Sequence, residues 1–516
     1  MIMAKGVRRQ YMRSEEDILE LNRGVGRILG RGCLVSVFIV CLCVGILRLW
    51  TYVREPRQGI IIENGTLVRA WGMQYVEIPD EVVEIGADAF ANCTELVEVK
   101  IPDSVRAIGD GAFFNCGLLD YVEIPEGVER IGERAFLCCS NLKRASLPET
   151  LQEIGYGCFE RCYSLKEVRI PSNIQELYSR SFHYCTNLER VILPDGIKKL
   201  HADAISKCPK LREINLPDTI EEMGDQVFYQ NESLEGLVIP EGILTLGERF
   251  CSGCVSLKTV TLPETLTELE AGAFYGCGMR SIAIPESVVK IGNGAFGDCT
   301  RLRDVMFHKL DDEVEIGSSA FQGTVFLEEL ESEGGCKYLG RNLVGCDRNA
   351  EWIQVADWVQ CIPQDVFTGH NVVRGIEFPA GLKRIEEHAF RQCGRLESIY
   401  IPEGVEDIGM WAFEGCSGLK SVSLPDSLEE IDACVFRGCS SLKEITWPPG
   451  LKEIHLHAFA GCKSLEFIEL PGGVEYIGEE AFLDCENLKR VIIPEGVKMK
   501  RGEAFKNCGG VEIISK

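Results

Sequence analysis

A repeat of 23 residues constrains the fold of this chain more than any other feature of its sequence. Prolines recur at this spacing in two runs, at positions 79, 102, 125, 148, 171, 194, 217, 240 and 263, and at positions 379, 402, 425, 448, 471 and 494. A fixed period between about 20 and 50 residues is typical of a solenoid, in which each unit buries its apolar face only against its neighbours. We therefore expect the 516 residues to form mainly stacked coils, and not about three or four globular domains.

One part of each unit has the pattern of a short strand. In the segment LKSVSLP, Val422 and Leu424 alternate with Ser421 and Ser423, which is the period of a half-buried strand. Pro425 ends the strand because it has no backbone N–H for the ladder. Stacking the units then predicts a parallel sheet that runs along the axis of the solenoid.

The rest of the unit, VEDIGMWAFEGC, returns the chain to the next strand. We expect Gly409 to let the backbone turn and the small Ala412 to let this segment pack closely. Its inward residues are predicted to be Val405, Ile408, Ala412, Phe413 and Cys416. Equivalent residues in successive units should form apolar columns along the axis.

A cysteine three residues after the phenylalanine position recurs in 15 of the 18 units that align on this segment. Asn231, Thr324 and His370 replace it elsewhere, so every substitute can also form hydrogen bonds. We interpret the column as reduced, buried and structural, with each S–H donating weakly to a turn carbonyl. Disulfides between stacked units are disfavoured because parallel Cβ vectors keep the sulfur atoms apart. The cysteine ladder comprises Cys93, Cys116, Cys139, Cys162, Cys185, Cys208, Cys254, Cys277, Cys299, Cys393, Cys416, Cys439, Cys462, Cys485 and Cys508.

Two local patterns resemble chemical sites. Cys251 and Cys254 form a C-x-x-C, but Cys254 belongs to the ladder and Cys251 occupies the phenylalanine position, which favours a local exchange of core residues. His455 and His457 lie on one side of an extended segment, but two histidines without a third ligand are a weak metal signal. We expect no metal and no cofactor.

The consensus L-x-x-V-x-[LI]-P-x-x-[VL]-x-x-I-G-x-x-A-F-x-x-C resembles the BspA-like leucine-rich repeats over about residues 75–516. The spacing, the proline, the Ala-Phe pair and the cysteine all recur together. The resemblance implies a right-handed leucine-rich-repeat superhelix of short strands and turns, with a parallel β-sheet on its concave face. It also implies a surface or secreted protein of a host-associated microbe that binds host or neighbouring-cell proteins. The family has no shared catalytic residues.

An apolar segment near the N-terminus predicts a membrane anchor. Residues 33–53 are long enough to span a bilayer and are interrupted only by Arg48, which can snorkel to the interface. A cleaved signal peptide is the alternative, but the leading region is long and no small-residue cleavage site follows. Seven basic residues against four acidic ones in residues 1–31 predict a single-pass protein with a cytoplasmic N-terminus and extracellular repeats.

Two regions interrupt the repeat. Residues 60–74 read as a hairpin that turns at Asn64-Gly65 and caps the solenoid, and residues 308–365 lose the period and insert a hairpin. This insertion is either a structural kink between two arms or a binding feature. The predicted segments are a cytoplasmic tail (1–31), a signal anchor (32–53), a linker (54–59), the capping hairpin (60–74), a first arm of repeats (75–307), irregular repeats with an insertion (308–365) and a second arm (366–516).

The sequence carries no enzyme motif that we can identify, including a P-loop, a G-x-S-x-G elbow or an H-E-x-x-H helix. A net charge of −25 disfavours nucleic acid as a partner. The outward strand positions vary from unit to unit while the inward ones stay constant, as a recognition surface requires. Aromatic and arginine side chains usually supply the binding energy of such surfaces. The candidate protein-binding residues are Tyr121, Arg144, Arg169, Tyr400, Phe467 and Arg490.

Three hypotheses for function follow. The first is a non-enzymatic, membrane-anchored surface protein that binds other proteins through a variable concave face, in adhesion or capture. The second is an intracellular or cell-envelope structural scaffold, which would follow if residues 33–53 do not export the chain. The third, an enzyme with a site in residues 308–365, has the least support because the region shows no nucleophile paired with a base.

Overall fold

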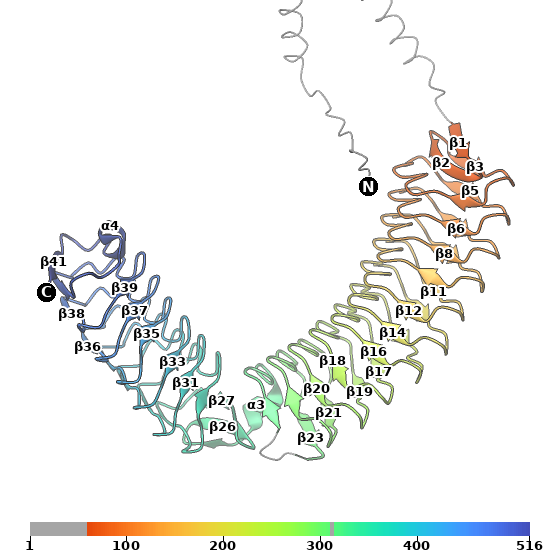
Figure 1. Ribbon diagram of the computed structural model, residues 1–516. Helices are drawn as coiled ribbons and strands as arrows, with labels where there is room; N and C mark the ends of the chain where they lie inside the picture. Colours follow the sequence, from red (N-terminus) through yellow and green to blue (C-terminus); the bar gives the residue numbers. More distant parts are fainter. Residues whose placement is uncertain (1–58, 310–313) are drawn as a thin grey trace, which may run out of the picture. The chain divides into compact units, whose positions relative to one another are not determined.

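The computed structural model describes residues 59–309 and 314–516, which form a solenoid of stacked coils with very little helix (Figure 1). Each regular coil contributes two short strands, and most of these strands pair in parallel with the equivalent strand of the next coil. We call the strand that precedes the repeat proline the leading strand and the other one the return strand. The predicted tail, anchor and linker lie outside the described residues. Within those residues, no helix has the length and apolar character needed to cross a membrane.

The leading strands are the strands that the sequence predicts. In β34 (Ser421–Ser423) Val422 is buried, and it lies in register with Ile399 of the preceding coil and Ile445 of the following one. The other leading strands are β3 (Tyr75–Glu77), β5 (Glu98–Lys100), β7 (Tyr121–Glu123), β9 (Arg144–Ser146), β11 (Glu167–Arg169), β13 (Arg190–Ile192), β15 (Glu213–Ile214), β17 (Gly236–Val238), β19 (Thr259–Thr261), β21 (Ser281–Ile284), β23 (Asp304–Phe307), β28 (Trp352–Gln354), β30 (Gly375–Glu377), β32 (Ser398–Tyr400), β36 (Glu444–Thr446), β38 (Phe467–Glu469), β40 (Arg490–Ile493) and β41 (Glu512–Ser515).

The return strands are a second set, which the sequence analysis did not predict. Each has two residues, the first facing outward and the second usually a buried Ile or Leu, so the stretch is too short to show an alternating pattern. They are β4 (Glu84–Ile85), β6 (Ala107–Ile108), β8 (Arg130–Ile131), β10 (Glu153–Ile154), β12 (Glu176–Leu177), β14 (Lys199–Leu200), β16 (Glu222–Met223), β18 (Thr245–Leu246), β20 (Glu268–Leu269), β22 (Lys290–Ile291), β24 (Glu315–Ile316), β29 (Cys361–Ile362), β31 (Arg384–Ile385), β33 (Asp407–Ile408), β35 (Glu430–Ile431), β37 (Glu453–Ile454) and β39 (Tyr476–Ile477).

The glycine after the return strand has a different role from the one expected. A Cβ on Gly409 would lie 2.6 Å from the backbone nitrogen of Glu387, so glycine is needed there for close approach between coils and not for a left-handed turn. The left-handed turns fall at two other positions of the coil, such as Trp411 with φ 57° and Gly415 with φ 74°. Non-glycine residues occupy many of these positions, at a cost of about 1–2 kcal/mol each.

The phenylalanine position forms columns of buried rings, interrupted where Ile205 replaces the ring and at the insertion. Phe90 and Phe113 stack with their ring centroids 4.8 Å apart, and Phe113 and Phe136 with theirs 5.0 Å apart. Where Cys251 occupies this position, Phe250 supplies the ring from the neighbouring position and meets Phe228 edge to face at 5.4 Å. Cys251 and Cys254 are free and fully buried, as an exchange of core residues requires.

The cysteine ladder lies beside the phenylalanine column. The Sγ atom of Cys116 donates to the carbonyl of Phe90 at 3.1 Å, and the same contact recurs between most successive coils. All cysteines among the described residues are free. At Asn231, which replaces a ladder cysteine, Nδ2 donates to Ile205 O at 2.8 Å. Burial raises the pKa of Cys116 and Cys208 to about 12, which keeps both as neutral thiol donors.

A hairpin begins the described chain. Strands β1 (Gly59–Glu63) and β2 (Thr66–Trp71) flank Asn64 and Gly65, whose φ angles of 51° and 81° are those of a tight hairpin turn. Strand β2 pairs in parallel with β4, so the hairpin covers the first edge of the return strands.

The insertion joins two cores. It contains α3 (Val325–Glu329), which the sequence analysis did not predict, and an antiparallel sheet of β25 (Ser332–Glu333), β26 (Cys336–Leu339) and β27 (Asn342–Cys346). Leu339 and Val344 belong to the core of the preceding coils, whereas Cys336 and Leu343 belong to the core of the following ones. The small sheet therefore has a structural role. The chain ends with α4 (Arg501–Ala504) and β41.

Candidate functional site

The outward side chains of the leading strands form two columns. In β7 the first and third residues, Tyr121 and Glu123, are exposed while Val122 between them is buried. Because neighbouring leading strands pair in register, the first residues of successive strands lie side by side, and so do the third residues. We call these the first and the second outward column.

The structure brings four of the six predicted binding residues together as two pairs. Tyr121 lies in register with Arg144, and Phe467 lies in register with Arg490, all four in the first outward column. In each pair the aromatic residue is exposed, Tyr121 to 37% and Phe467 to 50%, and the arginine is its neighbour on the next strand. Such pairs are the side chains that most often supply the energy of protein interfaces.

The other two predicted residues stand apart. Arg169 and Tyr400 lie in the second outward column, in different parts of the solenoid. Tyr400 is 62% exposed and lies beside Ser423 of the next coil, so its ring has open space next to it. It is a single exposed ring and not part of a pair.

Hydrogen bonds and ion pairs position the side chains of the paired residues. The Tyr121 hydroxyl donates to Glu123 Oε2 at 3.2 Å, and burial together with this carboxylate raises the pKa of the phenol above its usual value. Arg490 Nε lies 2.9 Å from Glu512 Oε2 of the next coil. Both partners are exposed, so these contacts orient the side chains without contributing much to stability.

Trp352 is a surface residue that the sequence analysis placed only in the insertion. It is the first residue of β28, it lies in register with Gly375, and it is 71% exposed. A Cβ on Gly375 would lie 2.1 Å from Cζ3 of the indole, so the ring rests against the glycine. Of the three strand residues, only Ile353 is buried. The alternation of EWIQV could have indicated from the sequence that this segment is a leading strand.

Other exposed apolar side chains on these columns were also missed. Tyr75 and Val238 are each 66% exposed, and Met306 is 58% exposed. Most of them are separated from the pairs by coils whose outward residues are polar. The columns therefore present single apolar side chains within a largely polar surface.

The outward residues of the return strands are mostly charged, and many of them pair between coils, as some on the leading strands also do. Arg130 Nε lies 3.1 Å from Glu153 Oε2, and Lys199 Nζ lies 2.7 Å from Glu222 Oε2. Exposed pairs of this kind contribute only about 0.2–1 kcal/mol each. This face is a solvated surface with few apolar anchors.

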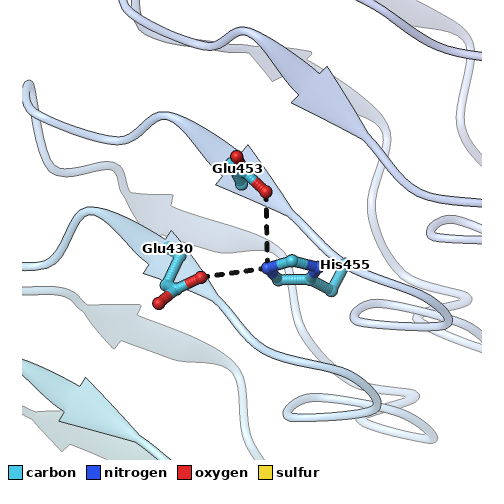
Figure 2. A group of neighbouring side chains, drawn as sticks. All are labelled: Glu430, Glu453 and His455. Atoms are coloured by element: carbon cyan, nitrogen blue, oxygen red, sulfur yellow. Dashed lines mark hydrogen bonds and ion pairs between the residues drawn. The ribbon is translucent and has the colours of Figure 1, made fainter.

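The two histidines singled out in the sequence do not converge. His455 Nε2 lies 3.1 Å from Glu430 Oε2, whereas His457 Nε2 lies 2.7 Å from Glu480 Oε2 (Figure 2 shows the first of these contacts). Together with Glu453, His455 forms a three-residue group that the sequence analysis missed, because its members come from two coils. Only the register of the return strands, Glu430 opposite Glu453, reveals it.

The insertion forms a hollow that contains a buried lysine. Lys337 is 8% exposed, and its Nζ donates to the carbonyls of Leu327 and Glu328 at 2.7 and 2.8 Å. The ammonium group thus caps the end of α3. Burial lowers the pKa of the adjacent His370, whose Nε2 bonds Asp347 O at 2.8 Å. These contacts hold the insertion together.

Comparison with known proteins identifies the repeat. The family model described as "BspA type Leucine rich repeat region" matches in six overlapping segments, residues 61–189, 153–277, 221–344, 267–394, 344–455 and 412–515. No curated protein matches the chain.

Several solved structures are similar in fold. A leucine-rich repeat protein from Bacteroides ovatus ATCC 8483 is 26% identical, with 89% of this chain and 97% of that chain covered and a TM-score of 0.42. A leucine rich cell surface protein from Faecalibacterium prausnitzii A2-165 is 23% identical, with 89% and 93% covered and a TM-score of 0.27.

Proposed function

This chain belongs to the BspA-type leucine-rich repeat family, and from that premise we propose that it is a non-enzymatic cell-surface scaffold that binds proteins through the outward columns of its leading strands. Repeat solenoids of this kind serve as scaffolds for protein interactions. The observation that carries the proposal is the contrast between the two faces. Both faces carry ion pairs between coils, but the leading strands also place exposed aromatic residues next to arginines, whereas the return strands expose mainly charges that pair with one another.

Each aromatic–arginine pair is suited to be an anchor for a partner. Phe467 and Arg490 lie side by side on adjacent strands, so one partner side chain can contact the ring and the guanidinium group together. Arg490 already has a carboxylate neighbour, Glu512, which holds its guanidinium group in place before a partner arrives. Little side-chain entropy is then lost on binding.

The expected orientation in the membrane supports a position outside the cell. The charge bias of residues 1–31 and the apolar stretch 33–53 favour a cytoplasmic N-terminus, with the repeats outside. Protease shaving of intact cells followed by peptide mass spectrometry tests this. Release of peptides from residues 75–516 before lysis supports the proposal. Release only after lysis refutes the surface location and favours an internal scaffold.

The binding face is tested by double substitutions. We expect Phe467→Ala with Arg490→Ala, or Tyr121→Ala with Arg144→Ala, to weaken attachment of the purified chain to host or neighbouring cells. The matched control is Arg130→Ala with Glu153→Ala, which removes an ion pair from the return strands and should leave attachment unchanged. Equal loss in the control would refute the assignment of the face. Circular dichroism must show that every variant keeps its fold.

A further inference from the structure

On the return strands β35 and β37, two carboxylates face each other without a lysine or arginine between them. Glu430 and Glu453 are directly in register on β35 and β37. Like charges placed directly opposite each other destabilise a sheet. At the corresponding place between some other coils a cation completes the pair, such as Lys199 beside Glu222 or Lys290 beside Glu268.

An imidazole nitrogen lies between these two carboxylates. His455 Nε2 is 3.1 Å from Glu430 Oε2 and 3.7 Å from Glu453 Oε2, and Figure 2 shows both carboxylates pointing at this one nitrogen. The three atoms lie within 4.8 Å of one another. Three ligands at about 2.0–2.2 Å from a tetrahedral zinc ion are about 3.3–3.6 Å apart, and the two measured distances bracket this range.

The charge around the group also favours a cation. Burial is the main cause that raises the pKa of Asp407 on the preceding coil; the guanidinium group of Arg384 opposes the increase, and the carboxylates of Asp432 and Glu430 add to it. The side chains of Glu430 and Glu453 are 65% and 46% exposed, so an ion can enter from solvent and keep a water ligand on its open side.

We propose that Glu430, Glu453 and His455 form a zinc site that joins two adjacent coils at the surface of the return strands. One imidazole nitrogen and two carboxylate oxygens match the ligands of zinc, whereas calcium needs about six to eight oxygen ligands. In this site the ion replaces the lysine that links return strands between other coils.

The chain contains its own control for this site. His201 Nε2 lies 2.9 Å from Glu176 Oε2 across the same interval of 25 residues that separates His455 from Glu430. The position that corresponds to Glu453 is occupied there by Lys199, which removes one ligand and adds a positive charge. The arrangement at His201 should therefore not bind zinc.

The experiment is isothermal titration of zinc chloride into the full-length, metal-free, reduced protein. We expect binding in the micromolar range that is weakened by roughly ten-fold or more in His455→Ala and in Glu453→Lys, and that is unchanged in His201→Ala. Glu453→Lys reproduces the arrangement of Glu176, Lys199 and His201, so its coil should fold, and it keeps every cysteine of the chain. Zinc affinity unchanged in Glu453→Lys, or no binding by the unsubstituted protein, would overturn the proposal.

A gain of binding provides the second arm of the test. Lys199→Glu places a carboxylate beside His201 and Glu176, and we expect it to add one zinc equivalent to the stoichiometry. An unchanged stoichiometry would show that three groups in this register do not suffice, and the assignment would fail. Calcium in large excess should not displace the zinc, and displacement would point to a general acidic surface instead.

Discussion

Replacing Cys162 with leucine and with alanine tests the packing of the cysteine ladder. Cys162 is fully buried, and its Sγ donates to Phe136 O at 3.3 Å. Alanine removes one buried heavy atom and a weak hydrogen bond, which together are worth about 1–2 kcal/mol. The carbonyl of Phe136 keeps a donor in this variant, because the backbone N–H of Cys139 also bonds it at 3.1 Å.

Leucine should be worse than alanine at this position. It removes the same hydrogen bond and forces two further heavy atoms into a turn that stacks on Cys139 and Cys185 above and below. Overpacking of this kind costs about 1–3 kcal/mol, so we expect a total of about 2–4 kcal/mol. Serine keeps the donor and should differ from the unsubstituted protein by about 1 kcal/mol.

Urea titration in the presence of a reductant, followed by circular dichroism, measures the three variants. The midpoints are the quantity to compare, since a long repeat array need not unfold in two states. The expected order of stability is serine, then alanine, then leucine. A tolerated leucine together with a severe loss for alanine would refute the view that the thiols fill space and donate hydrogen bonds inside a tight turn.

Three further outcomes are expected. Asn231→Ala should lower the free energy of unfolding by about 2–3 kcal/mol, because the Asn231 side chain makes two buried hydrogen bonds of 2.8 Å. In the same urea titration, Asn231→Cys should be closer in stability to the unsubstituted protein than Asn231→Ala is. Cys138→Gly should raise the free energy of unfolding by about 1 kcal/mol, because Cys138 has a left-handed φ of 64° that glycine adopts without strain. Gly415→Ala should lower the free energy of unfolding by a similar amount, because Gly415 has a φ of 74°. A thermal melt in which both substitutions shift stability in the same direction would contradict the strain argument. Burial lowers the pKa of His183 from 6.5 to about 4, so the unfolded chain binds the proton more readily than the folded chain. The free energy of unfolding should therefore fall by about 1–2 kcal/mol between pH 6.5 and pH 5. His183→Gln should lack this decrease when urea midpoints are compared across pH.

The sequence predicted the parts of the fold that repeat every 23 residues. Buried phenylalanines, cysteines and leading strands recur at fixed offsets, so one unit shows what all of them do. The return strands could not be predicted in the same way, since two residues cannot show an alternation. The close approach at Gly409 was misread as a turn because both roles require glycine.

The sequence analysis named the candidate binding residues one at a time, although the repeat length could also have paired them. Knowing that Phe467 and Arg490 point outward needed only the strand period, and their spacing of 23 residues suggested that they are neighbours. Trp352 was not predicted as an outward strand residue, because the 23-residue repeat is lost around it. The group of Glu430, Glu453 and His455 was not predicted, because only the register of the return strands shows that the three residues are neighbours.

The hydrogen bonds between coils have a mechanical consequence. Most ladder thiols, and many backbone N–H groups, donate to the neighbouring coil. A pull along the chain therefore loads the interface between one pair of coils at a time. Unfolding one coil of 23 residues at the end releases roughly 80 Å of extended chain before the next interface between coils bears the load. A solenoid tethered at one end and held by a partner at the other would lengthen in steps under flow, and each step would dissipate force that otherwise acts on the bound partner.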